Sequence, residues 1–369
     1  MMKKTWYPAL ALVLVIVVWL SGCQGFSPGF STTYESQSTK IQYDISYGYQ
    51  VNTSGAGRYE ITYLCDIPKV VLGSATYSIL FNRDYEVQTR ANNTFVRWNI
   101  SGDEETMFKL GLSTHVEANS FLVSDLNGKG AVTLEQLPVI YPEIVRKYTH
   151  VQANETTAFI DPKNLEITAI AQGVQTTAKT NNTFLLAKAL FAWLKTHVQY
   201  QAHPEEVGVQ PAEVTLQSKS GDCDDLSFLY ISLCRSLGIP ARFVRGYLLT
   251  AYENGTAVAI AHAWTEVFVG DSLGSNGWVP VECACCVTSV KTDTEQNFGV
   301  EDAFHLRLFT DCGSNESLTL SLSGISYVTY GITRHIQLSA FAEVRNYQVL
   351  TSQKLVVDSD NTRHYEQAR

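Results

Sequence analysis

The sequence predicts an α+β protein, with a β-rich amino-terminal part followed by two helices and a second group of strands. Between residues 41 and 160, apolar and aromatic residues alternate with polar ones, which is typical of strands that bury one face. From Asn182 the apolar residues recur at helical spacing instead. Further alternating runs follow the helices. The two kinds of pattern occupy separate stretches of the chain, which favours the α+β class.

The β-rich part is predicted over residues 41–165. Alternating residues run from Tyr43 to Val51 and from Tyr59 to Tyr63, with the turn-forming segment NTSGAG between them. Residues 96–100 repeat the pattern with Val, Trp and Ile. No group of catalytic side chains is evident in this part.

Two amphipathic helices are predicted in the middle of the chain. The first lies within residues 183–200, and the second begins near Cys223 and ends at Gly238, with Pro240 just beyond it. Three strands are then expected, at 242–250, 257–270 and 278–282. The remaining residues, 291–369, form a predicted β-containing extension in which Leu318, Leu320 and Leu322 alternate.

The first 22 residues predict an export signal, because two lysines precede an apolar run from Ala9 to Leu20. The ending LSGC resembles the lipobox of prokaryotic lipoproteins, which implies a lipid on Cys23 and a mature chain held outside the cell membrane. A signal with a chance cysteine is the alternative. Residues 23–40 are rich in Ser, Thr and Gly and predict a flexible tether.

Asn-X-Ser/Thr sequons agree with an extracytoplasmic location and predict a glycosylated surface. Together with the lipobox they suggest an archaeal source. The candidate asparagines are Asn52, Asn92, Asn99, Asn154, Asn181, Asn254 and Asn315.

The charge of the chain excludes a polyanion partner such as a nucleic acid. Removal of the signal takes away two lysines and no acids, so the net charge changes from −9 to −11. The remaining length of about 350 residues is sufficient for two hydrophobic cores. The sequence leaves the oligomeric state open.

Cys223 is predicted at the first turn of a helix, where unpaired backbone N–H groups favour an anion. We therefore expect an easily ionised thiol, whose thiolate is the nucleophile. Asp224 and Asp225 stabilise the helix start but oppose the thiolate, so a cationic neighbour is needed. His262, flanked by alanines on a strand, is the candidate, and Glu282 at the end of the next strand is the candidate for orienting its imidazole.

Four ordered motifs, GDCDDLS, SLGIPARFVRG, HAWTEV and GWVPVE, resemble the transglutaminase-like superfamily, relatives of the papain-like thiol enzymes. The resemblance covers residues 166–283 and implies a domain over 166–290, in which the cysteine heads a helix packed on an antiparallel sheet. It implies Cys223 as nucleophile, His262 as general base and acid, Glu282 as third member, a peptide or protein substrate and no cofactor.

The third position departs from the family, which usually has aspartate followed by proline where this chain has Glu282 and Cys283. Either the strand shifts to accommodate the longer acid, or the site is weakened. Asp271 is an alternative third member. The sequence thus predicts a thiol enzyme that cleaves or transfers amide acyl groups, with hydrolysis favoured. The alternative is an inactive binding or structural module.

The other cysteines and histidines are assigned no catalytic role. Disulfides fit an exported protein better than a metal site, but the sequence does not rank the pairings. The cysteines concerned are Cys65, Cys234, Cys283, Cys285, Cys286 and Cys312. The histidines predicted as surface or packing residues are His115, His150, His197, His203, His305, His335 and His364.

Overall fold

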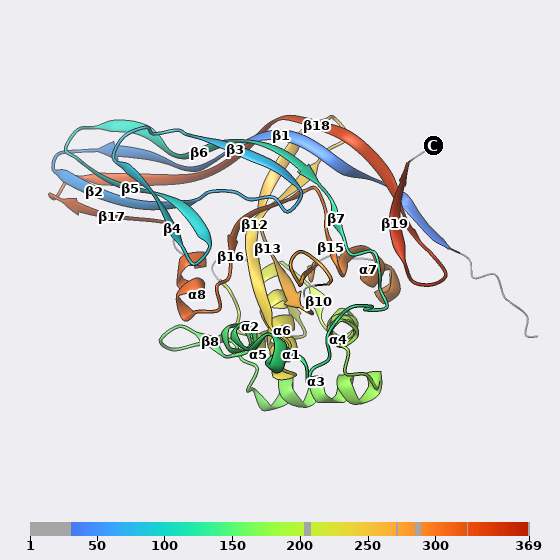
Figure 1. The fold of residues 1–369 in the computed structure, drawn as a ribbon. Helices are drawn as coiled ribbons and strands as arrows, with labels where there is room; N and C mark the ends of the chain where they lie inside the picture. Colours follow the sequence, from blue (N-terminus) through green and yellow to red (C-terminus); the bar gives the residue numbers. More distant parts are fainter. Residues whose placement is uncertain (1–30, 203–207, 271, 285–288, 323, 368–369) are drawn as a thin grey trace, which may run out of the picture.

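The structure of the chain is a computed structural model that describes residues 31–202, 208–270, 272–284, 289–322 and 324–367. Within these residues the chain has the predicted α+β fold. Long strands form the upper part of the view in Figure 1, and helices surround β12 and β13 in the lower part.

Two antiparallel sheets make up the upper part. The first has the order β19-β18-β1-β6-β3 and consists of β1 (Thr32–Ser54), β3 (Gly73–Ile79), β6 (Thr106–Asn119), β18 (His335–Val357) and β19 (Arg363–Gln367). The second has the order β17-β2-β5-β4 and consists of β2 (Arg58–Asp66), β4 (Tyr85–Arg90), β5 (Asn93–Gly102) and β17 (Ile325–Tyr330). Alternate residues of both sheets, such as Tyr43, Ile61 and Trp98, are buried in one core. The predicted strand pattern is confirmed.

The carboxyl-terminal strands complete both sheets. β18 pairs with β1 along its whole length, from Thr32 opposite Val357 to Ser54 opposite His335, and β17 pairs with β2. In Figure 1 the blue β1 and the red β18 lie side by side. Residues 325–367 therefore belong to the same two sheets as the amino-terminal strands. The predicted carboxyl-terminal extension, which begins at residue 291, is joined to the β-rich part through these strands.

The composition of residues 23–40 predicts a flexible tether, but residues 32–40 form the first part of β1. Their backbone groups are ordered by the ladder with β18, a partner more than 300 residues later in the chain. The rest of the predicted tether, the signal over 1–22 and Cys23 lie outside the described residues.

The lower part contains a sheet of order β14-β13-β12-β16 with helices around it. Its strands are β12 (Ala241–Ala251), β13 (Ala257–Phe268), β14 (Trp278–Val281) and β16 (His305–Thr310). The helices are α1 (Leu137–Ile140), α2 (Pro142–Tyr148), α3 (Leu165–Ala178), α4 (Thr183–His197), α5 (Ala212–Ser218), α6 (Cys223–Ser236), α7 (Val290–Asn297) and α8 (Asn315–Leu322). The two predicted helices are confirmed as α4 and α6, and the three predicted strands as β12, β13 and β14.

Helix α6 lies in the centre of the lower core and packs against β13, β12, α3, α4 and α5. Leu229, Leu233 and Cys234 have no exposed surface, and the Tyr230 hydroxyl donates to the Ala187 carbonyl of α4 at 2.9 Å. Gly238, with φ of 79°, lies just beyond its end. Burial on all sides holds the helix rigidly, and with it the residue at its amino-terminal end.

One predicted element has the wrong type, since the alternating leucines of residues 318–322 lie in helix α8. A short run of Leu, Ser and Thr fits either period, so its tertiary surroundings decide. None of the helices in the described residues has the length and apolar character that crossing a bilayer requires. The short strand pairs are β7 (Phe121–Leu122) with β15 (Val300–Glu301), β8 (Gln152–Ala153) with β9 (Ala158–Ile160), and β10 (Gln199–Tyr200) with β11 (Ser220–Gly221).

Candidate active site

Cys223 is the first residue of α6, as predicted. A capping box fixes this helix start, in which the Asp222 backbone N–H donates to the Asp225 carboxylate at 3.2 Å. The same carboxylate, fully buried, accepts the Gln210 backbone N–H at 2.7 Å and its side-chain amide at 2.8 Å. Asp225 therefore ties the preceding loop to the helix and fixes the position of Cys223.

Cys223 and His262 line the same cavity, which has a volume of about 350 Å³. The backbone N–H of Ala263, the residue after His262, hydrogen bonds to the Cys223 thiol. The structure thus brings the helix end and the strand together, as the sequence predicts. The apolar walls of the cavity include Phe159, Val209, Phe228 and Phe243.

The surroundings of Cys223 favour the neutral thiol. Burial, with a further contribution from the Asp224 carboxylate, raises the pKa of the Cys223 thiol to about 12, and the Ala263 N–H offsets this only in part. The expected easily ionised thiol is therefore wrong for the resting site, because burial outweighs the helix amino terminus. Burial and the hydrogen bond with Asp222 also raise the pKa of Asp224 to about 8.

His262 and Glu282 form a buried pair at the end of β14. The Nε2 of His262 donates to the Oε2 of Glu282 at 2.6 Å, and the two side chains are 9% and 6% exposed. The other oxygen, Oε1, accepts the Ala284 backbone N–H at 2.7 Å. Burial alone would raise the pKa of Glu282, but the bonds and charges of His262 and then His305 hold it well below its usual range. Since Nε2 is occupied, Nδ1 is the nitrogen of His262 left to exchange a proton.

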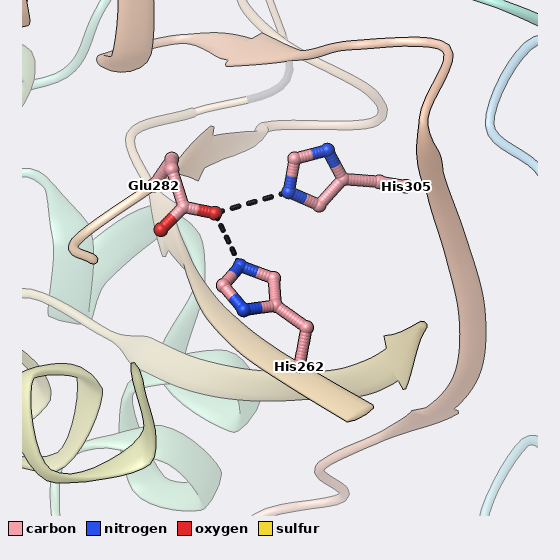
Figure 2. A group of neighbouring side chains, drawn as sticks. All are labelled: His262, Glu282 and His305. Atoms are coloured by element: carbon pink, nitrogen blue, oxygen red, sulfur yellow. Dashed lines mark hydrogen bonds and ion pairs between the residues drawn. The ribbon is translucent and has the colours of Figure 1, made fainter. Parts of the chain in front are cut away.

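His305 belongs to the same group: it is buried, as a packing residue is, and it also contacts Glu282, which the sequence does not predict. Its Nε2 donates to the same Oε2 of Glu282 at 3.0 Å, and its Nδ1 contacts the Oδ1 of Asp302 at 2.7 Å. Figure 2 shows both imidazoles directed at one oxygen of Glu282. The only local signal in the sequence is an acid three residues earlier. Asp271, the alternative orienting acid, lies outside the described residues, as does His203.

Among the described residues, two groups of side chains have ligand atoms close enough to contact one cation. One consists of His262, Glu282 and His305, and the other of the consecutive residues Asp222, Cys223 and Asp224. Ligands of a tetrahedral zinc ion lie about 3.3 Å apart, given metal–ligand bonds of about 2.0–2.1 Å. The separations from Glu282 to the two histidines, 2.6 and 3.0 Å, are shorter and fit direct hydrogen bonds. These three residues therefore fit a hydrogen-bonded group better than a metal centre.

Trp264 forms a wall beside both imidazoles. Its ring centroid lies 6.0 Å from that of His262 and 4.8 Å from that of His305, and its Nε1 donates to Glu301 at 3.0 Å. Arg307 donates to Glu301 and to Glu266 of β13, at 2.7 Å in each case. These buried ion pairs join the strands that carry the two histidines.

The structure also locates the remaining predicted modification sites. All seven sequon asparagines are exposed. Cys234 is buried in the core as predicted, and all five described cysteines are free thiols. Cys285 and Cys286 lie outside the described residues, so the predicted disulfides that involve them stay a prediction.

Residues 168–283, which contain this site, match the family model of the transglutaminase-like superfamily. Two curated relatives match shorter stretches. An uncharacterized protein of Bacillus subtilis (strain 168), YebA, is 37% identical over 75 residues, which cover 18% of this chain and 10% of the relative. An uncharacterized protein of Mycobacterium leprae (strain TN), ML0607, is 28% identical over 113 residues, which cover 30% of this chain and 39% of the relative. The chain thus spans well under half the length of either relative.

Solved structures resemble the chain over a larger part of its length. A candidate cysteine protease from Cytophaga hutchinsonii has a TM-score of 0.46 and 14% identity, covering 91% of this chain and 100% of that one. The periplasmic domain of TgpA from Pseudomonas aeruginosa has a TM-score of 0.33 and 14% identity, covering 64% of this chain and 89% of that one.

Proposed function

We propose that this chain, whose residues 168–283 form a domain of the transglutaminase-like superfamily, is a surface-anchored thiol enzyme that cleaves or transfers amide acyl groups. One observation carries the proposal. Cys223 at the start of α6 and His262 of β13 line one cavity, while a buried carboxylate holds the far nitrogen of the imidazole. A nucleophile, a base and a group that orients the base are the parts that acyl transfer requires.

In this reaction the Cys223 Sγ attacks the amide carbonyl while its proton passes to Nδ1 of His262. The carbon–nitrogen bond then breaks, and His262 returns the proton to the leaving amine. Water or an amine next attacks the thioester and gives its proton to His262. The carbon–sulfur bond then breaks, and His262 passes that proton to the leaving sulfur, which restores the neutral thiol of Cys223. Because the resting thiol is neutral, attack and proton transfer occur together rather than from a preformed thiolate.

The cavity indicates the class of substrate. Phe228, Phe243 and Val209 form apolar walls beside Cys223, so an apolar side chain next to the scissile amide is favoured. Arg245 also lines the cavity, but its guanidinium is paired with Asp66 at 2.6 Å. Asp222 and Asp224 line the same cavity, so charge does not select between water and an amine. We favour water, the more abundant nucleophile, as the acceptor, which makes the chain a peptidase or amidase.

The extracytoplasmic setting is part of the proposal. Its support is the lipobox-like ending at Cys23, which would carry the lipid, and the exposure of every sequon asparagine. A lipid anchor would place the cavity in reach of peptides and proteins outside the cell.

The raised pKa of Cys223 favours a second candidate, an inactive binding or structural module on the same scaffold. A thiol that stays protonated without any assistance from His262 would bind a peptide in the cavity without forming a thioester. The two candidates differ in whether bonds in the peptide are broken.

The test is incubation of the purified chain with a pool of peptides that carry apolar residues, with and without a primary alkylamine. Mass spectrometry of the products reads the outcome. We expect cleaved peptides with water added, and none with Cys223→Ala, whereas Cys65→Ala, which alters another buried thiol, retains activity. Products joined to the amine would instead establish a transamidase. No product under either condition would contradict the enzyme and support the module.

A further inference from the structure

Glu282 is held by three N–H donors from three parts of the chain. Oε2 accepts from His262 at 2.6 Å and from His305 at 3.0 Å, and Oε1 accepts from Ala284 at 2.7 Å (Figure 2). His305 begins β16, which pairs with β12 and not with the strand of His262. A side chain from a different strand therefore contacts the same oxygen that orients the candidate base.

The partners of His305 define its charge. Its Nδ1 faces Asp302 at 2.7 Å and its Nε2 faces Glu282 at 3.0 Å. Ionised carboxylates only accept hydrogen bonds, so both ring nitrogens must donate, and a ring with two N–H groups is an imidazolium. The side chains of His305 and Glu282 are each 6% exposed, so this charge is shielded from water. The buried cation stabilises the ionised form of Glu282.

We propose that His305 is a positioning residue, a charged imidazole that holds Glu282 so that the longer acid orients His262 for acyl transfer. The inference rests on the proposed function. Glutamate has one more rotatable bond than the aspartate usual at this position, and a displaced carboxylate would tilt the His262 ring. Bonds at both oxygens remove that freedom, and positional errors of about 1 Å cost about 100-fold in rate.

The proposal predicts a dependence on pH. Burial lowers the pKa of His305, but Asp302 and then Glu282 outweigh burial and hold that pKa well above its usual value. The titratable groups nearest His305 are those of Glu282, His262 and Asp302. Trp264 also contacts the His305 ring and bonds to Glu301, which is paired with Arg307. Tyr365 lies near Asp302. Because this pKa is raised, the His305 cation persists at neutral pH. The charge is lost as the pH rises through the pKa that His305 has in the folded protein. Activity and the stability due to this group should therefore both fall at alkaline pH.

The test compares kcat/KM of peptide cleavage between pH 5 and 10 for the full chain, three variants of this group and one control variant. His305→Leu removes both bonds and should lower kcat/KM by about 10- to 100-fold at pH 7. His305→Gln keeps one donor to Glu282 and should recover part of that loss, without the alkaline decline due to His305. Asp302→Asn removes the outer acid, which is 40% exposed, and should move the alkaline decline to lower pH.

The matched control is His115→Gln, because the half-exposed His115 of β6 contacts Asp44 at 2.7 Å, the same distance as His305 to Asp302. It should leave the rate and the pH profile unchanged. Thermal melting checks that each variant folds, and the exposure of Asp302 keeps that variant usable if His305→Leu does not fold. An active parent with unchanged profiles in His305→Gln and Asp302→Asn would overturn this inference alone. A parent without Cys223-dependent activity would overturn the proposed function as well.

Discussion

Glu282→Gln is expected to lower the rate of acyl-enzyme formation by about 10³- to 10⁴-fold, the scale seen when an orienting carboxylate becomes an amide. The carboxylate meets His262 and His305 on one oxygen and the Ala284 N–H on the other. An amide offers one acceptor oxygen, so its NH₂ group faces a donor whichever way it is turned. Either His262 loses the partner that fixes its tautomer, or the Ala284 N–H loses its acceptor.

A rapid-quench assay with a peptide anilide measures this rate, and Glu343→Gln, which alters an exposed acid paired with Lys109, is the control. The shorter side chain of Glu282→Asp should also be slower than the parent, by about 10-fold or more, because it cannot reach both histidines. If Glu282→Asp matched or exceeded the parent, the glutamate would be a defect of the site and not a built feature.

Arg235→Met should lower the free energy of unfolding by about 3–5 kcal/mol, since it leaves a buried charge without its partner. Arg235 lies in the last turn of α6, and neither its side chain nor that of Asp311 is exposed. Its guanidinium donates to Asp311 at 3.2 Å, to the Ala241 carbonyl at 2.7 and 2.9 Å, and to the His150 carbonyl at 2.8 Å. These bonds attach the carboxyl end of α6 to the start of β12.

Urea unfolding followed by circular dichroism gives the stability difference. Arg345→Met is the matched control, because Arg345 pairs with Glu343 while 75% exposed and should contribute about 0–1 kcal/mol. Adding Asp311→Asn to Arg235→Met should restore part of the loss, since the amide keeps an acceptor without the unpaired charge. A loss of under 1 kcal/mol for the single variant would show that the buried pair does not stabilise the fold.

The sequence predicts those features that depend on local pattern. The alternation around Tyr43 and Tyr59 locates β1 and β2, and the leucine spacing with Gly238 locates α6 and its end. Cys223 at the helix start and His262 on β13 follow from the same patterns and from the family motifs. These features are confirmed because each is determined by residues within about one element.

The features missed are those that depend on pairing between distant segments. His305 reaches Glu282 only because β16 pairs with β12, with His305 opposite Leu248, and nothing next to His305 in sequence shows this. Residues 32–40 likewise form a strand only because they pair with β18. The raised pKa of Cys223 escapes prediction for a related reason, because surrounding elements set the burial of the thiol while its position at the helix start is local. Sequence motifs and hydrophobic periodicity identify the candidate catalytic residues, whereas tertiary packing determines their pKa values and their hydrogen-bond partners.

Trapping of the thiol by an electrophile shows whether His262 activates Cys223 for attack on an acyl group. The full chain is incubated at pH 7 with a peptide vinyl sulfone that carries an apolar side chain, and the adduct is followed by intact mass and mapped by peptide digestion. One adduct is expected, on Cys223, and it should form about 100-fold more slowly in His262→Ala. An adduct that forms at the same rate without His262, or no adduct on Cys223, would show that His262 does not activate this thiol.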